Sequence, residues 1–166
     1  MSDQGIEPRG RYFEELAVGD TITTPARTIT EADVVNFAAL SGDWNQLHTD
    51  AEYASKTPFG ARIAHGLLGL AVASGLGARL GFIEGTAEAF LKLEWRFRKP
   101  IYLGDTIHLR GEVTRTKAVR SMGGGIVVFD MKLLNQRGET VQEGQWTLAI
   151  KGRPKKSAPQ ADGSES

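Results

Sequence analysis

A carboxylate, an amide and an imidazole occur together in one short polar stretch of the chain. The stretch runs Ser41-Gly42-Asp43-Trp44-Asn45-Gln46-Leu47-His48-Thr49-Asp50. A carboxylate and a histidine that hold one water between them can remove a proton from it and deliver a proton to a neighbouring carbon. Histidine titrates near neutrality and can play either part. Asp43 and His48 are therefore a candidate acid/base pair for adding water across a conjugated double bond.

Two other interpretations of this stretch remain open from residue types alone. Asp43 and Asn45 could cap turns, with His48 in an ordinary loop hydrogen bond. Asp43, His48 and Asp50 could instead ligate a metal, but Leu47 and a missing glycine break the calcium-loop pattern. Of the 3 histidines in the chain, no second one lies at zinc-ligand spacing from His48. We therefore expect no metal.

Downstream, the segment Ile63-Ala64-His65-Gly66 precedes an apolar run and should open a helix. The first turn of a helix leaves amide hydrogens unpaired at the positive end of its dipole, so the Gly66 N–H could bind a carbonyl and stabilise enolate charge. His65 is more simply interpreted as a buried histidine bonded to backbone. The alternative for Gly66, and our expectation for Gly69, Gly75 and Gly77, is that glycine only allows close packing of a sheet on the helix.

Two helices are expected to position these groups. Thr30-Glu31-Ala32-Asp33 has the form of a capping box and is followed by apolar residues at helical spacing, which predicts a short helix ending near Leu40. Residues 41–64 lose this periodicity, and we expect a long non-helical loop there. Gly66 to Leu80 is apolar on almost every face, which predicts a helix surrounded by protein.

Strands are expected after this helix. Leu91, Leu93, Trp95 and Phe97 alternate with charged residues, which predicts a strand with one buried and one wet face. Similar alternation occurs over residues 107–113, 126–134 and 140–150, with turns at 100–105, 123–125 and 135–139. A weak earlier strand, residues 21–24, continues towards Thr28 past Pro25, which suggests a sheet edge. One buried helix followed by four strands predicts an α+β domain whose antiparallel sheet wraps that helix.

Composition excludes several other classes of protein. The 166 residues suit a single domain. Basic and acidic residues balance at 20 each, so no field exists to collect nucleic acid or anionic lipid. The absence of cysteine excludes disulfides and thiolate chemistry. The start, Met-Ser-Asp-Gln-Gly, lacks the features of a secretory signal, and the uncharged stretch 63–78 is too short to span a bilayer. We therefore expect a cytoplasmic protein with no nucleic-acid or membrane partner.

Both ends of the chain differ in composition from the middle. Residues 1–10 and 152–166 are polar, rich in Pro, Gly and Ser, and almost free of bulky apolar side chains. Such segments cannot bury enough apolar surface to order themselves. The sequence therefore predicts disordered ends around one domain over residues 11–151.

The two polar motifs resemble those of the MaoC-like family of (R)-specific enoyl-CoA hydratases and dehydratases. The family carries Gly-Asp-x-Asn-Pro-x-His, followed by a small residue, His-Gly and a central helix; here Gly42 to His48 and Ala64-His65-Gly66 match it. The similarity runs roughly from Tyr12 to Lys151. Gln46 departs from the pattern, because the family usually has proline there, which would preorganise the loop.

The resemblance implies a hot-dog fold, in which a curved antiparallel sheet wraps a long helix, and a homodimer or higher homo-oligomer. It implies that Asp43 and His48 hold the attacking water and that the Gly66 N–H binds the thioester oxygen. The substrate would be an acyl-CoA thioester, with no separate cofactor. The supporting or substrate-binding positions would be Asn45, His65 and Ser74.

The sequence therefore predicts reversible hydration of a trans-2-enoyl-CoA to the (R)-3-hydroxyacyl-CoA, with Asp43, His48 and Gly66 as the catalytic groups. A hot-dog acyl-CoA thioesterase is an alternative, because fold does not determine reaction. A non-catalytic acyl-CoA-binding or regulatory protein on the same scaffold is another.

Overall fold

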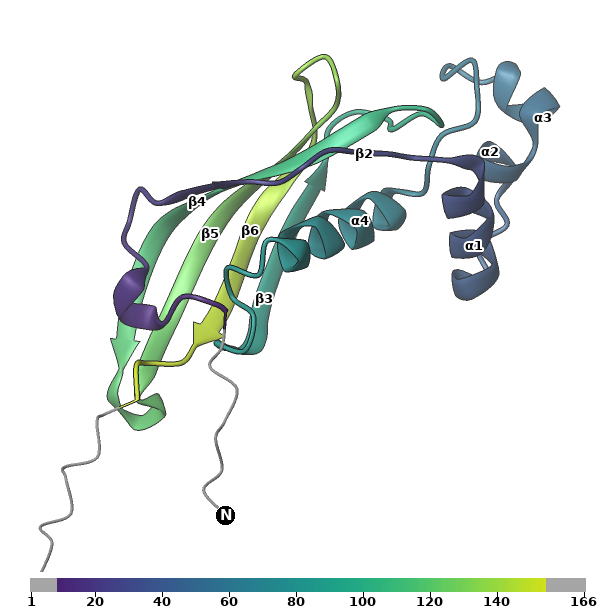
Figure 1. The fold of residues 1–166 in the computed structure, drawn as a ribbon. Helices are drawn as coiled ribbons and strands as arrows, with labels where there is room; N and C mark the ends of the chain where they lie inside the picture. The colour runs from purple at the N-terminus through teal and green to yellow at the C-terminus, as the bar shows by residue number, and fades with distance from the viewer. Residues whose placement is uncertain (1–8, 155–166) are drawn as a thin grey trace, which may run out of the picture.

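A curved antiparallel sheet with one helix, α4, lying across its inner side forms the frame of the protein (Figure 1). The computed structural model describes residues 9–154. Its elements in chain order are η1 (Phe13–Glu15), β1 (Thr21–Thr23), β2 (Arg27–Thr28), α1 (Glu31–Ser41), α2 (Gln46–Thr49), α3 (Ala51–Ser55), α4 (Gly66–Arg79), β3 (Ala87–Phe97), β4 (Thr106–Val119), η2 (Arg120–Met122), β5 (Gly124–Leu134) and β6 (Thr140–Ile150).

The strands follow the order β1-β4-β5-β6-β3, and the short β2 pairs with β4. Hairpins join β4 to β5 and β5 to β6, and all pairs are antiparallel. The predicted α+β class and the helix-then-strands order are confirmed. So is the edge position expected for the first strand, because β1 ends the sheet at one side and β3 ends it at the other.

Helix α4 is buried on one side only. Leu68, Val72, Ala73 and Leu76 pack into the core against the sheet. The opposite side carries Leu67, which is 61% exposed. The prediction that protein surrounds this helix on every side was therefore wrong for the single chain. The sheet covers one side of α4, and nothing in the described part of the same chain covers the other.

Strand β3 departs from its predicted burial in the same way. Leu91 is 50% exposed, Leu93 44% and Phe97 55%, although they belong to the apolar set that was expected to be buried. The alternation itself is real, but β3 is outermost and pairs only with β6. The row lies at the margin of α4, where Phe97 is close to the Gly66 backbone and Leu93 borders the exposed side of the helix, so α4 covers these side chains only in part.

The expected loop between α1 and α4 contains two short helices. Asn45 caps α2 by accepting a hydrogen bond from the Leu47 N–H at 2.9 Å. Asp50 caps α3 by accepting one from the Tyr53 N–H at 2.9 Å. The prediction of a non-helical stretch was wrong because a helix of about one turn is too short to show a hydrophobic period. His48 therefore lies on a helix.

The predicted disordered ends fall mainly on residues 1–8 and 155–166, which lie outside the described part of the chain. Inside it, the Gly10 N–H donates to the Glu84 carbonyl at 2.9 Å and the Arg153 N–H donates to the Glu14 carboxylate at 2.9 Å. Between residues 9 and 154, no helix is both long and apolar enough to cross a membrane.

Candidate active site

Asp43 is positioned by the end of α1. Thr30 and Asp33 form the predicted capping box at the start of this helix, and Gly42 ends it in the left-handed conformation with φ 76°. That conformation favours glycine because it has no Cβ. Asp43 follows directly, and its Oδ1 accepts a hydrogen bond from the Asn45 N–H at 3.2 Å. The exposed carboxylate therefore begins the turn that leads into α2.

His48 lies in the last turn of α2 and is half-buried. Its Nδ1 is 2.7 Å from the Ile63 carbonyl oxygen. A carbonyl can only accept, so Nδ1 carries the proton of this bond and Nε2 of the neutral ring is a proton acceptor. The bond also fixes α2 against the segment that leads into α4.

His65 is the residue just before α4, and only 2% of it is exposed. Its Nε2 donates to the Asp43 carbonyl oxygen at 2.9 Å. Its ring lies 3.9 Å from that of His48, centroid to centroid, and 4.9 Å from that of Phe37. His65 therefore contacts the main chain of one member of the predicted acid/base pair and the ring of the other.

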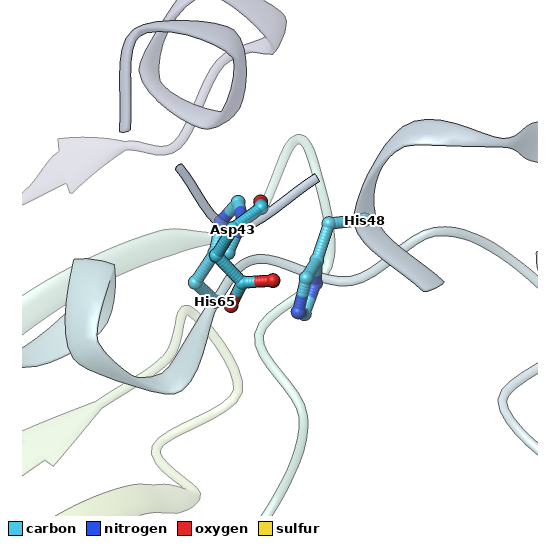
Figure 2. A group of neighbouring side chains, drawn as sticks. All are labelled: Asp43, His48 and His65. Atoms are coloured by element: carbon cyan, nitrogen blue, oxygen red, sulfur yellow. The ribbon is translucent and has the colours of Figure 1, made fainter. Parts of the chain in front are cut away.

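Asp43, His48 and His65 form one cluster, in which one ligating atom of each lies within 4.8 Å of the others (Figure 2). Asp50, the third metal ligand considered from sequence, instead caps α3. An imidazole binds a metal along the plane of its ring, and the planes of His48 and His65 are inclined by only 32°. His48 Nδ1 and His65 Nε2 also already bond to main-chain carbonyls, so each ring has only its other nitrogen left for a ligand. The arrangement suits proton transfer better.

Gly66 is the first residue of α4, and it lies beside the His48 end of this cluster. A Cβ at this position would lie 2.9 Å from the Phe97 ring, so glycine keeps Phe97 close to the backbone. The carbonyl of Gly66 accepts a hydrogen bond from the Gln142 side chain at 3.0 Å. The N–H groups of this first helical turn have no acceptor within the helix and are available to a ligand.

Two cavities flank this start of α4. One, of ≈330 Å³, is lined by His48, Gly66, Phe59, Phe97 and Gln142 among others. The second, of ≈300 Å³, follows the exposed side of α4 and is mainly apolar; it is lined by Leu67, Leu70, Ala71, Ser74, Phe90, Leu93 and Trp146. A larger hollow of ≈670 Å³ lies over β3, β5 and β6 and borders none of the predicted site residues.

The structure therefore brings Asp43, His48, His65 and Gly66 together and places Asn45 as the cap that orients α2. Ser74 is not in this group. It lies on the exposed side of the same helix, about 12 Å further along at the usual rise per residue, and borders the apolar cavity.

Sequence reasoning missed two groups at the site. The Ile63 carbonyl holds His48, and a main-chain oxygen leaves no signal in residue type. Gln142 does leave a signal in the sequence. It lies on the same face of β6 as Trp146 and Leu148, and all three are buried. A polar residue in an otherwise inward-facing apolar set is a detectable anomaly.

The cations near the site are already paired. Arg62 makes a two-pronged contact with Glu31, at 2.8 and 2.5 Å, which ties the segment after α3 to the start of α1. Hydrogen bonding to Arg62 lowers the pKa of Glu31 below its ordinary value, so this carboxyl stays charged. Arg98, beside the cavity at His48, pairs with Glu143.

Comparison with known proteins places these residues in a family. The family model for the MaoC-like domain matches residues 14–130. The (R)-specific enoyl-CoA hydratase of Rhodospirillum rubrum is 34% identical over 149 residues, covering 86% of this chain and 93% of that protein. Protein MaoC of Klebsiella aerogenes is 41% identical over 110 residues, covering 66% of this chain but only 32% of that longer protein.

Solved structures agree on the architecture. A monoamine oxidase regulatory protein from Archaeoglobus fulgidus superposes with a TM-score of 0.81 at 35% identity, covering 87% of this chain and 97% of that one. A conserved hypothetical protein from Mycobacterium tuberculosis, described as having a double hotdog fold, gives a TM-score of 0.76 at 21% identity, over 92% of this chain and 48% of that one. The expected hot-dog fold is confirmed, with α4 as its central helix.

Proposed function

The chain belongs to the MaoC-like family of hydratases and dehydratases, and we propose from this premise that it interconverts a trans-2-enoyl-CoA and the (R)-3-hydroxyacyl-CoA. The observation that carries the proposal is the Asp43 carboxylate beside the His48 ring, next to the free amide end of α4 at Gly66. His48 and Gly66 line one cavity, and Asp43 lies beside His48; a proton-transfer pair close to an oxyanion donor is what hydration of a conjugated thioester requires.

In the proposed reaction, Asp43 and His48 hold one water between them. The water oxygen forms a bond to Cβ of the enoyl group while one of its protons passes to this pair. The electrons of the double bond move towards the thioester carbonyl, and the Gly66 N–H stabilises the negative charge that develops on its oxygen. The pair then returns a proton to Cα. The product has gained the elements of one water, and the enzyme returns to its starting state.

The tautomer of His48 suits this role. Its Nδ1–H is engaged by the Ile63 carbonyl, which leaves Nε2 to accept a proton from water. The imidazolium formed in this way becomes a donor at the same atom. His48 and Asp43 can thus carry the proton from oxygen to carbon without any other titratable side chain.

The acyl chain has a natural path along α4. From a carbonyl bound at Gly66, the exposed side of the helix leads to the apolar cavity between Leu67 and Trp146. Ser74 borders that cavity, which supports its assignment near the acyl group. Burial of the chain there would supply apolar binding energy without contact to the reacting atoms.

We also propose that the protein is a homodimer joined through β3. The open edge of this strand offers unpaired backbone groups, and its apolar side chains Leu91, Leu93 and Phe97 are exposed in one copy. Antiparallel pairing of β3 with the same strand of a second copy would satisfy the edge and bury these side chains. It would also cover the open side of α4.

The experiment that tests the activity is turnover of crotonyl-CoA and longer trans-2-enoyl-CoAs, with chiral analysis of the product. Asp43→Asn and His48→Ala should each reduce kcat by about a hundredfold or more, as expected for loss of an acid/base group. Asp50→Asn is the matched control, because asparagine still caps α3 and the residue lies outside the cluster. Near-normal turnover by both site variants would contradict the proposal, and release of free CoA would show a thioesterase instead.

A further inference from the structure

Gln142 is a polar side chain in an apolar setting. It is 2% exposed and lies on β6 among inward-facing residues, between α4 and the sheet. Burial of a primary amide without partners costs free energy, so a buried glutamine needs hydrogen bonds at both of its ends. A leucine or methionine of similar size would fill the same space at lower cost.

Both ends of the amide are bonded, and the bonds fix its orientation. The Trp95 indole N–H donates to Gln142 Oε1 at 2.9 Å, and Gln142 Nε2 donates to the Gly66 carbonyl at 3.0 Å. An indole nitrogen can only donate and a carbonyl can only accept. The amide therefore cannot flip without the loss of both bonds, and Trp95, Gln142 and Gly66 form one directed chain.

Gly69 provides the space for this chain. A Cβ at position 69 would overlap the amide of Gln142 and would lie 2.8 Å from Ile101 Cδ1. Glycine is needed at position 69, one helical turn after Gly66, because the Gln142 side chain lies against the helix there. A glycine in a core helix gives up packing contacts and a buried amide costs desolvation, yet both occur at the same place.

We propose that Gln142 is a positioning residue for the hydration reaction: it holds the Gly66 backbone so that the amide end of α4 faces the thioester oxygen. The inference rests on the proposed function. Gly66 has no side chain to anchor it and lies in the first turn, where helices fray. The Gln142 amide supplies an anchor from the sheet, which is the more rigid element.

The test compares Gln142→Met with Gln145→Met. Both replace a glutamine of β6, but Gln145 bonds to Asp130 and lines the hollow over β3, β5 and β6. In Gln142→Met we expect kcat to fall about tenfold with KM changed by less than about threefold. The Gly66 N–H, which is the proposed donor to the thioester oxygen, would be misplaced but still present. Trp95→Phe should shift kcat in the same direction by a smaller factor. Gln145→Met should match the wild type.

Amide hydrogen exchange gives a second readout that needs no substrate. The Gly69 N–H bonds to the His65 carbonyl at 3.2 Å in the same turn of α4. Its exchange should quicken about tenfold in Gln142→Met while core amides of β5 stay protected. With an active wild type, an unchanged kcat in Gln142→Met would overturn the inference, and so would unchanged Gly69 exchange. A general loss of protection with a lower melting temperature would also overturn it, because Gln142 would then act on the fold as a whole.

The two proposals can fail separately. A wild-type protein inactive on every enoyl-CoA would refute the hydratase, and Gly69 exchange would then decide alone whether Gln142 holds the first turn. An active wild type with a fully active Gln142→Met variant would refute only the positioning role.

Discussion

The imidazole rings of His48 and His65 lie with their centroids 3.9 Å apart and their planes inclined by 32°. His65 also donates to the main-chain oxygen of Asp43. One buried ring thus supports both members of the proposed acid/base pair. The two contacts are chemically different, one through a hydrogen bond and the other through a ring face, and substitution can separate them.

His65→Phe should keep a ring against His48 and lose the donor to Asp43, whereas His65→Gln keeps a donor and loses the ring. We expect each variant to lose about tenfold in kcat with little change in KM, because displacement of a reacting group by a fraction of an ångström reduces turnover without affecting binding. His108→Gln, on β4, is the control and should be unaffected. Wild-type kcat in both His65 variants would show that neither contact matters.

Gln46→Pro should stabilise the protein. Gln46 is the first residue of α2, where the N–H has no acceptor within the helix, and Asn45 before it has ψ 134°, a value that a following proline allows. Proline there should add about 0.4–1 kcal/mol to the free energy of unfolding by restricting the unfolded chain. The measurement is urea denaturation of both proteins.

The adjacent substitution Leu47→Pro should have the opposite effect. It removes the N–H that bonds to Asn45 Oδ1 at 2.9 Å and so uncaps α2. The pair of variants therefore distinguishes a helix-start effect from a general effect of proline. Equal destabilisation by both would contradict the position assigned to residue 46.

Leu93→Lys should break the proposed dimer. A charged side chain in the middle of the apolar row of β3 would be buried without a partner when two copies pair. Light scattering on a sizing column should give the mass of a monomer for this variant. Glu94→Lys introduces the same group on the other face of the strand and should keep the mass of the dimer. A monomeric wild type would rule out the pairing.

Acid should weaken the turn between β5 and β6 through Glu139. Hydrogen bonds from Asn135, Lys99 and Arg137 lower the pKa of Glu139 from 4.5 to about 2. Between these values the unfolded chain binds a proton that the folded chain does not, so the contribution of Glu139 is complete above pH 4.5 and is lost as the pH falls towards 2.

Glu139→Gln should therefore reduce stability above this window and flatten the loss of stability within it. Urea denaturation at several pH values measures both effects. Glu112→Gln, an exposed carboxyl on β4, is the comparison. A wild type and a Glu139→Gln variant whose stabilities fall in parallel with pH would show that Glu139 contributes nothing to the acid sensitivity.

Most helices and strands could be predicted from the sequence because caps and hydrophobic alternation depend only on residues close together in the chain. The capping box at Thr30 and Asp33 and the alternation in β3 need only their own neighbours to be recognised, and both elements form where expected. Burial is different. Leu93 has the pattern of a core residue, but whether it is covered depends on which strand ends the sheet, and that is a property of the assembled chain.

Groups of the candidate site that are marked by a reactive residue type could be predicted from the sequence. Groups that belong to the site only because the fold brings them there could not. Asp43 and His48 are recognisable as titratable groups beside a glycine. The Ile63 carbonyl could not be recognised, because every residue has one. Gln142 lies far from the motifs in sequence, and only the pairing of β6 with β3 and its contact with α4 bring it to Gly66.

Trp95 links the proposed dimer interface to the proposed site, so dilution of the protein should affect its activity. It lies on β3, the strand that would join two copies, and its indole N–H begins the chain that ends at the Gly66 carbonyl. Separation of the copies would expose this strand to water and loosen the first link of that chain. Specific activity per molecule should therefore depend on protein concentration and fall on dilution below the dissociation constant of the proposed dimer, with every residue of the proposed site still present.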